Sequence, residues 1–155
     1  MILWMLACGA EKKTPDPEVT ESPVPVAGFY DVTVAEEWDG DCNLDDPVTY
    51  EAPEQEWEAD PRGDVLILYQ DDWTPSSCVL TGLDFVCDDG SWNESRAQVT
   101  KTVEGTFTED GEVSGVKAVE LDCGGAGCDI LEEMYGQRLD VPCRVEAAFE
   151  GSLGD

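Results

Sequence analysis

Oxygen-bearing side chains occupy alternate positions in one short acidic stretch of the chain, at Asp39, Asp41, Asn43 and Asp45. Carboxylate and amide oxygens are the ligands that Ca²⁺ prefers in proteins. The spacing therefore predicts a candidate calcium site at these four residues, with Cys42 available to brace the loop through a disulfide. A solvated acidic loop is the alternative. The composition favours it, because 36 of the 155 residues are Asp or Glu and such clusters arise without a ligand.

This spacing resembles the first half of an EF-hand loop, and the second half departs from that pattern. Leu44 stands at the sixth position, where the sharp turn of an EF-hand loop needs glycine. Tyr50 stands at the twelfth position, and Glu51 comes one residue late. We therefore expect any calcium ion to be held by the first half of the loop.

The chain contains no histidine. This excludes Ser-His-Asp and Cys-His catalysis and histidine-ligated zinc. An enzyme built on this sequence would have to work with carboxylates alone, as glycosidases do, and nothing in the sequence indicates a cleft for that chemistry. We therefore expect a non-catalytic protein, with calcium as its only candidate cofactor.

The charge balance is strongly negative, with 36 Asp and Glu against 8 Lys and Arg, for a net charge of -28. Nucleic acid is excluded as a partner, because phosphate recognition begins with clustered Lys and Arg. Many carboxylates also keep a surface hydrated, so solubility and salt tolerance are the simpler explanation of the charge. A cation-binding face is the alternative.

Residues 2–7 are all apolar, but this run is far below the ~18 residues that a membrane-spanning helix needs. Met5-Leu6-Ala7-Cys8 resembles a bacterial lipobox, the motif in which the cysteine is lipidated and becomes the mature N-terminus. The resemblance implies a signal segment over residues 1–7, a lipid anchor on Cys8, and an outer-membrane or cell-surface location, because Gly9 follows the cysteine. The apolar run is short and no Lys or Arg precedes it, so we expect the true start codon to lie upstream.

Residues 8–27 form the predicted tether between this anchor and a folded head. From Glu11 to Ala27 the sequence has four prolines and no aromatic residue, so it lacks the apolar surface needed to fold. Proline at this density favours extended polyproline II, at about 3.1 Å per residue, which lets the tether hold the head up to ~50 Å from the membrane.

The six remaining cysteines form an even set. Export implies an oxidising compartment, so three disulfides are expected rather than a zinc site, which would need close pairs such as C-x-x-C. Cys78 and Cys87 face each other across a hairpin that turns at Gly82-Leu83, where glycine in the first turn position is typical of type II′. Cys123 and Cys128 bracket a glycine-rich loop, which leaves Cys42 to pair with Cys143.

Alternating apolar residues, typical of strands, dominate residues 28–155. Tyr30, Val32 and Val34 share one face, and the run from Val65 to Tyr69 suits a buried strand. A third pattern alternates apolar with charged residues near the end of the chain, at Val141, Cys143, Val145, Ala147 and Phe149.

The hairpin between Val99 and Leu121 has one register that keeps its apolar residues together. A three-residue loop, with Gly111 in the left-handed conformation, pairs Phe107 with Val113 and Val99 with Leu121. A two-residue loop would shift the register by one and turn the apolar set outward. We therefore predict the three-residue loop.

One short helix is expected near residues 130–135, between the last two strands. Asp129 and Glu132 resemble a capping box, and Gly136 would end the helix. Its predicted apolar side consists of Ile130, Leu131 and Met134.

These elements predict an all-β fold, a small antiparallel up-and-down barrel of about eight strands closed first to last, with a two-sheet sandwich as the alternative. Gly28-Phe29-Tyr30 resembles the lipocalin entry motif over three residues, without its tryptophan, and slightly favours the barrel. Two acidic turns carry a tryptophan, at Asp71-Asp72-Trp73 and at residues 88–92. Such a tryptophan can stack on sugars or cations, although a tryptophan that lids the barrel is the commoner arrangement.

The sequence thus predicts a monomeric, membrane-anchored lipoprotein with a non-catalytic binding or structural head. One hypothesis is a small apolar ligand in the barrel interior or mouth. The alternative is a surface module that meets cations, glycans or proteins through its acidic loops.

Overall fold

The computed structural model describes residues 22–43, 52–70 and 74–154. Nine strands and one helix occur in these ranges. They are β1 (Gly28–Val34), β2 (Asp39–Gly40), β3 (Glu54–Arg62), β4 (Val65–Tyr69), β5 (Pro75–Thr81), β6 (Asp84–Glu94), β7 (Ala97–Phe107), β8 (Glu112–Cys123), α1 (Ala126–Tyr135) and β9 (Cys143–Leu153). Among the described residues, no helix has the length and apolar character that a membrane crossing requires.

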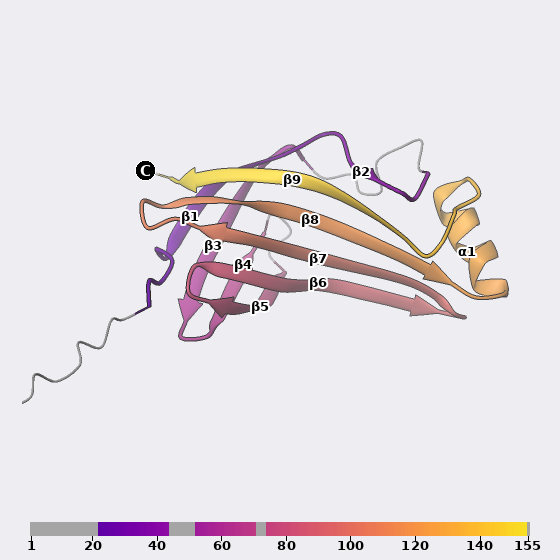
Figure 1. Cartoon of the computed structure of the whole chain (residues 1–155), viewed down its shortest axis with the longest axis horizontal. Coiled ribbons are helices and arrows are strands. Elements are labelled where there is room, and N and C mark those ends of the chain that lie inside the picture. The colour runs from indigo at the N-terminus through magenta and orange to yellow at the C-terminus, as the bar shows by residue number, and fades with distance from the viewer. Residues whose placement is uncertain (1–21, 44–51, 71–73, 155) are drawn as a thin grey trace, which may run out of the picture.

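Eight of the strands form a closed antiparallel barrel, as the sequence predicts. Neighbours follow chain order from β3 to β9, and β1 pairs with both β3 and β9 to close the ring (Figure 1). The two-residue strand β2 is additional and pairs with β9 next to the stretch that pairs with β1. The predicted two-sheet sandwich alternative is wrong, because one continuous sheet closes on itself and leaves no second layer.

The strands differ in length, and this gives the barrel two unlike ends. Strands β6 to β9 have 11 or 12 residues, whereas β4 has 5. The long strands run on past the short ones toward α1, which lies at that end of the molecule (Figure 1). The core follows this division into a first cluster inside the barrel and a second cluster under α1.

Aromatic rings fill the first cluster, which includes Tyr30, Trp57, Phe85, Phe107 and Phe149. The packing depends on two glycines that face each other across β7 and β8. A Cβ at Gly105 would lie 3.0 Å from the ring tips of both Phe85 and Phe149. The pair of glycines thus makes room for two phenylalanines from the flanking strands β6 and β9.

The predicted hairpin registers are confirmed. Val79 pairs with Val86 and Cys78 with Cys87 around a turn in which Gly82 has φ 64°. In the longer hairpin, Phe107 pairs with Val113 and Val99 with Leu121, and Gly111 has φ 84°. Both turns use glycine where a side chain would be strained.

Two expectations about burial need correction. The run from Val65 to Tyr69 is not a fully buried strand, because only Leu66 and Leu68 are buried and the other three side chains face outward, partly exposed. Met134 does not belong to the apolar side of the helix, since it is 52% exposed. The helix instead buries Leu131 and Gly127, one turn apart.

The helix also begins earlier than the sequence predicts. It starts at Ala126, after Gly125, and no side chain caps its first turn, so Asp129 lies within that turn rather than at a capping position. There its negative charge still faces the positive end of the helix dipole favourably. Gly136 ends the helix in the left-handed conformation, as predicted.

The last residues of the predicted tether lie against the barrel. Residues 22–27 carry neither helix nor strand. Pro25 is buried, and the hydroxyl of Tyr30 donates a hydrogen bond of 2.8 Å to the carbonyl oxygen of Val26. Burial raises the pKa of Tyr30 above its usual value. The rest of the predicted tether, together with Cys8 and the signal segment, lies outside the described residues.

Candidate functional site

All six cysteines beyond Cys8 are paired as predicted, in three disulfides. The bond between Cys78 and Cys87 lies inside the barrel, with both residues buried and their Cα atoms 4.0 Å apart. The bond between Cys42 and Cys143 joins residues 101 apart in the sequence and ties β2 to the start of β9. One bond thus joins β2 to β9 and the other joins β5 to β6, on opposite sides of the barrel.

The third disulfide, Cys123–Cys128, supports the tip of the β6–β7 hairpin. The amide of Gly124 donates to the carbonyl oxygen of Arg96 at that tip, at 3.1 Å. Gly127 packs so closely on the tip that a Cβ there would lie 2.5 Å from the backbone of Arg96 and Ala97. The disulfide loop therefore clamps the hairpin against α1.

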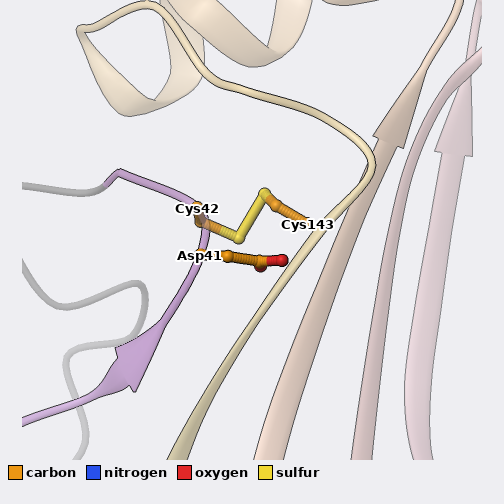
Figure 2. A group of neighbouring side chains, drawn as sticks. All are labelled: Asp41, Cys42 and Cys143. Carbon is orange, nitrogen blue, oxygen red and sulfur yellow. A yellow bond between two sulfur atoms is a disulfide. The ribbon is translucent and has the colours of Figure 1, made fainter.

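The predicted calcium stretch lies along β2 and the residues after it. Figure 2 shows Asp41 beside the disulfide of Cys42 and Cys143. Both sulfur atoms are used in that bond, so neither is a thiolate ligand for a metal. One carboxylate oxygen of Asp41 accepts a hydrogen bond of 2.7 Å from the backbone amide of Arg144, which makes this side chain part of the β2–β9 contact.

The other predicted calcium ligands are spread along the same edge. Asp39 is exposed and pairs with Glu146 of β9. Asn43 has a positive φ of 54°, and its carbonyl oxygen accepts a hydrogen bond from the side chain of Gln137. Asp45 lies outside the described residues. The calcium site therefore stays a prediction, with the described acidic pair Asp39 and Asp41 placed along one edge.

A guanidinium sits among carboxylates on the outer face of the long strands. Arg144 on β9 makes three ion pairs, at 3.3 Å to Glu146, 2.8 Å to Glu120 and 3.2 Å to Glu104. We call these four residues the Arg144 network. The hydrogen bond to Glu120 is the main reason that the pKa of Arg144 is raised, and Glu146 adds to it, while partial burial opposes it.

A depression of about 400 Å³ adjoins this network. Strands β7 to β9 and the residues beside the Cys42–Cys143 disulfide form its wall. The lining residues are Asp41, Gln98, Thr100, Glu120, Leu121, Asp122, Pro142, Cys143 and Arg144. Three carboxylates and one guanidinium leave the depression negative, so its charge suits a cationic ligand rather than an anion.

A polar chain of hydrogen bonds crosses the barrel interior, and the sequence interpretation missed it. The ammonium of Lys117 donates to the side-chain oxygen of Gln70 at 2.8 Å. Gln70 in turn donates to a carboxylate oxygen of Asp89 at 2.5 Å, and the hydroxyl of Ser76 donates to the same oxygen at 2.8 Å. The Lys117 ammonium also lies 5.7 Å from the ring centroid of Trp57.

These hydrogen bonds provide a partner for the ammonium of Lys117, a residue that is only 4% exposed. They link β8, β6, β5 and the residue after β4, and Asp89 reaches them from an irregularity in the β6–β7 pairing between Asp88 and Gly90. The signal in the sequence was available, because the predicted register places Lys117 on the same face as Val113 and Leu121. We assign this series of hydrogen bonds a structural role, since a buried charge requires hydrogen-bonding partners.

The prediction of two acidic turns that carry a tryptophan is wrong for residues 88–92, because they lie within β6, at the irregularity in the β6–β7 pairing between Asp88 and Gly90. Trp92 is partly buried against the second core cluster, which matches a tryptophan that lids the barrel. Trp38, which precedes β2, packs against both clusters. Asp71, Asp72 and Trp73 lie outside the described residues.

No protein-family model and no curated protein sequence matches the chain. Among solved structures, it is similar to the monomer form of the PknI sensor domain of M. tuberculosis, with a TM-score of 0.51 and 12% sequence identity. The similarity covers 85% of this chain and 89% of that one. At this identity it concerns the fold alone.

Proposed function

We propose that this chain is an exported lipoprotein, anchored by lipid on Cys8, whose barrel head binds a partner through its outer surface and catalyses no reaction. The pairing of all six other cysteines is the observation that carries the proposal. Disulfides persist in oxidising compartments and are rare in the cytosol. The seventh cysteine, Cys8, is then left over at the position where the lipobox-like motif places a lipid.

The fold supports a binding role. The PknI sensor domain, which shares this fold, is by its description a sensor, and sensing requires binding rather than turnover. The described ion pairs of the outer surface join Arg62 to Asp60, and Arg144 to Glu104, Glu120 and Glu146. The acidic surface also suits the cell envelope, where a strongly charged domain stays hydrated.

The interior offers weaker support for a small apolar ligand. Five aromatic side chains fill the first core cluster, and Phe107 contacts both Tyr30 and Phe85, at ring-centroid distances of 5.3 Å and 5.0 Å. A ligand entering here would have to displace packed rings. Native mass spectrometry of the full chain tests this directly, because a co-purified lipid mass would favour the interior over the surface.

Metabolic labelling with palmitate tests the anchor. The chain is expressed from its own locus, so that the natural start codon is used, and is compared with a Cys8→Ser variant. We expect label in the wild type and none in the variant. A Cys123→Ser/Cys128→Ser variant is the matched control, because it removes cysteines without touching Cys8 and should keep the label. Label that survives Cys8→Ser would contradict the proposal.

Alkylation of free thiols tests the compartment independently. A chain folded outside the cytoplasm should protect all six head cysteines until a reductant is added, whereas a cytosolic chain would expose them. Mass spectrometry counts the added alkyl groups. Six alkylated cysteines in freshly lysed cells without reductant would remove the basis of the proposal.

Calcium binding is the second candidate, because Asp39 and Asp41 stand with Glu146 around a depression of about 360 Å³. Arg144 also lines this depression, and its positive charge opposes a cation there. Thermal melts with Ca²⁺, Mg²⁺ or EGTA separate a specific site from charge screening. A rise in Tm that Ca²⁺ alone produces, and that Asp39→Asn removes, would support the site, and equal effects of the two cations would reject it.

A further inference from the structure

The outer face of β4, β5 and β6 carries a row of apolar side chains where polar ones are expected. Val65 pairs directly with Val79, and Val79 pairs directly with Val86. Val79 is 68% exposed and Val86 52% exposed. We call these three residues the valine row. Ile67 and Tyr69 extend the same face along β4 and are partly exposed.

This juxtaposition is unusual within the described part of the molecule. The other large apolar side chains that are exposed there do not face one another across a strand pair, whereas Val79 and Val86 do. Isolated exposed apolar residues are normal on protein surfaces, but a contiguous group with a polar border marks an interaction site. The three strands are neighbours in the barrel wall, so the valine row is a continuous surface feature (Figure 1).

A hollow of about 470 Å³ adjoins one end of the valine row. It lies over β6, β7 and β8, and its lining includes Asp84, Val86, Glu104, Thr106 and Val116. The hydroxyl of Thr106 donates a hydrogen bond of 2.6 Å to Asp84 and fixes that carboxylate at the edge of the hollow. The hollow thus offers apolar walls at Val86 and Val116 and two carboxylates, at Asp84 and Glu104, of which Glu104 also pairs with Arg144 at 3.2 Å.

The border of this face is acidic. Its carboxylates come from the strands and turns that flank the valine row, at Asp60, Asp64, Asp84, Asp88 and Glu104. Arg62 pairs with Val65 across β3 and β4, but its guanidinium is bound to Asp60 at 2.5 Å. A second copy of the chain would bring two acidic borders together at a net charge of -28 each. Charge complementarity therefore selects a positively charged occupant.

We propose that the outer face of β4–β6 docks an extended segment of a partner protein that presents aliphatic side chains, and then a Lys or Arg, on one face at every second residue. The aliphatic side chains cover the valine row, and a basic side chain enters the hollow between Asp84 and Glu104. This inference rests on the proposed surface-binding function and names its partner class. Strands β4 to β8 are five neighbours spaced ~4.8 Å apart, so about six extended residues cross from the row to the far side of the hollow.

A peptide of about eight residues serves as the probe, with Val at its first and third positions, Lys at its fifth and seventh positions and Ser elsewhere, so that the Val and Lys side chains share one face. It is titrated into the full chain carrying Cys8→Ser, and heteronuclear NMR follows the backbone amides. We expect saturable binding, with shifts concentrated on β4, β5 and β6 and at the hollow. A Ser and Lys peptide of equal length and charge should bind at least about tenfold more weakly, because it lacks the apolar contact.

The variant Val79→Thr/Val86→Thr tests the row itself, since threonine keeps the shape and strand preference of valine but replaces one methyl group of each side chain with a hydroxyl. We expect it to weaken the Val and Lys peptide about tenfold. Met134→Gln is the matched control, because Met134 is as exposed as Val86, at 52%, but lies on α1. It should leave the affinity unchanged.

Three outcomes would overturn the proposal. Equal affinity of the two peptides would reduce the interaction to general charge attraction. Unchanged binding to the double threonine variant would place the site elsewhere. Sedimentation that shows a dimer, lost in that variant, would make a second copy the occupant. Each of these leaves the palmitate and thiol results untouched, so a failure here is distinguishable from failure of the lipoprotein proposal.

Discussion

The barrel wall has two outer faces that follow the same strand alternation and use it differently. On β7 to β9 the outward positions carry charge, and Arg144 gathers three glutamates from three neighbouring strands. On β4 to β6 the outward positions at Val65, Val79 and Val86 are apolar, although alternation assigns them to solvent.

The contrast separates what the fold needs from what it does not. In each strand of the barrel, the inward positions need apolar side chains, whereas the outward positions accept any polar side chain. Charged residues on β7 to β9 meet that requirement and leave a hydrated surface. The valine row exposes apolar area that contributes little to the fold, so a partner is the better explanation of its presence.

The disulfides provide the largest test of the difference between the two sides. Cys42–Cys143 joins residues 101 apart on the β9 side, whereas Cys78–Cys87 joins residues 9 apart on the β5–β6 side. In the loop-entropy account, removing the first bond costs about 4.7 kcal/mol and removing the second about 2.7 kcal/mol. Denaturant unfolding of the two double alanine variants measures this difference. Equal losses would show that closure of the long loop does not distinguish the two sides.

The Arg144 network gives the next effect in size. Arg144 is 38% exposed and its partners 46–53% exposed, so solvent screens each pair, and we expect Arg144→Met to cost about 1 kcal/mol. The loss should shrink at about 1 M salt, where the Debye length falls to ~3 Å. Arg62→Met removes one exposed pair beside the valine row and should give no measurable change.

If both arginine variants lost the same stability at low and at high salt, the three ion pairs of Arg144 would contribute no more to stability than the single pair of Arg62. Chemical denaturation at the two salt concentrations measures both variants under the same conditions. The contrast between the two outer faces is supported if only the stability loss of Arg144→Met depends on salt.

Below the two faces lie two core clusters, and each holds a tyrosine whose pKa burial raises, Tyr30 in the first and Tyr135 beside the second. An unfolded tyrosine ionises near pH 10. The stability linked to the raised pKa is therefore fully present below pH ~10 and is lost as pH rises through the folded pKa.

We expect the free energy of unfolding to fall in that alkaline range. Tyr30→Phe and Tyr135→Phe should each flatten the fall, because phenylalanine does not ionise. Tyr30→Phe should also lower stability at neutral pH, since its hydroxyl donates to Val26. A titration of phenolate absorbance measures the ionisation directly, and a normal pKa for both residues would contradict the burial argument.

Much of the architecture was predictable because it depends on local rules. Turn glycines and alternation fixed the two hairpin registers, and those registers brought the cysteines of β5 and β6 together. The start of α1 was missed because no side chain caps it. Its first turn instead depends on the Cys123–Cys128 loop and on contact with the hairpin tip, which are tertiary features.

The exposure of the valine row was harder to predict than the strand pairing. The pairing of Val79 with Val86 was predicted, but alternation alone does not say how much of an outward valine a neighbouring element covers. The hydrogen bonds that link Lys117 to Asp89 through Gln70 were not predicted, because Asp89 turns inward only at an irregularity in the β6–β7 pairing.

The smallest expected effect is also the sharpest test of the comparison. Val79→Thr/Val86→Thr should change the free energy of unfolding by less than about 0.5 kcal/mol, because both side chains are already largely in solvent. Val103→Thr provides the contrast, since Val103 is 0% exposed and a buried hydroxyl without a partner costs about 1–3 kcal/mol. Denaturant unfolding measures the stability of both variants. A large loss in the double variant would make the valine row part of the fold, whereas a negligible loss would leave its exposed area without a structural reason and so strengthen the case for a partner.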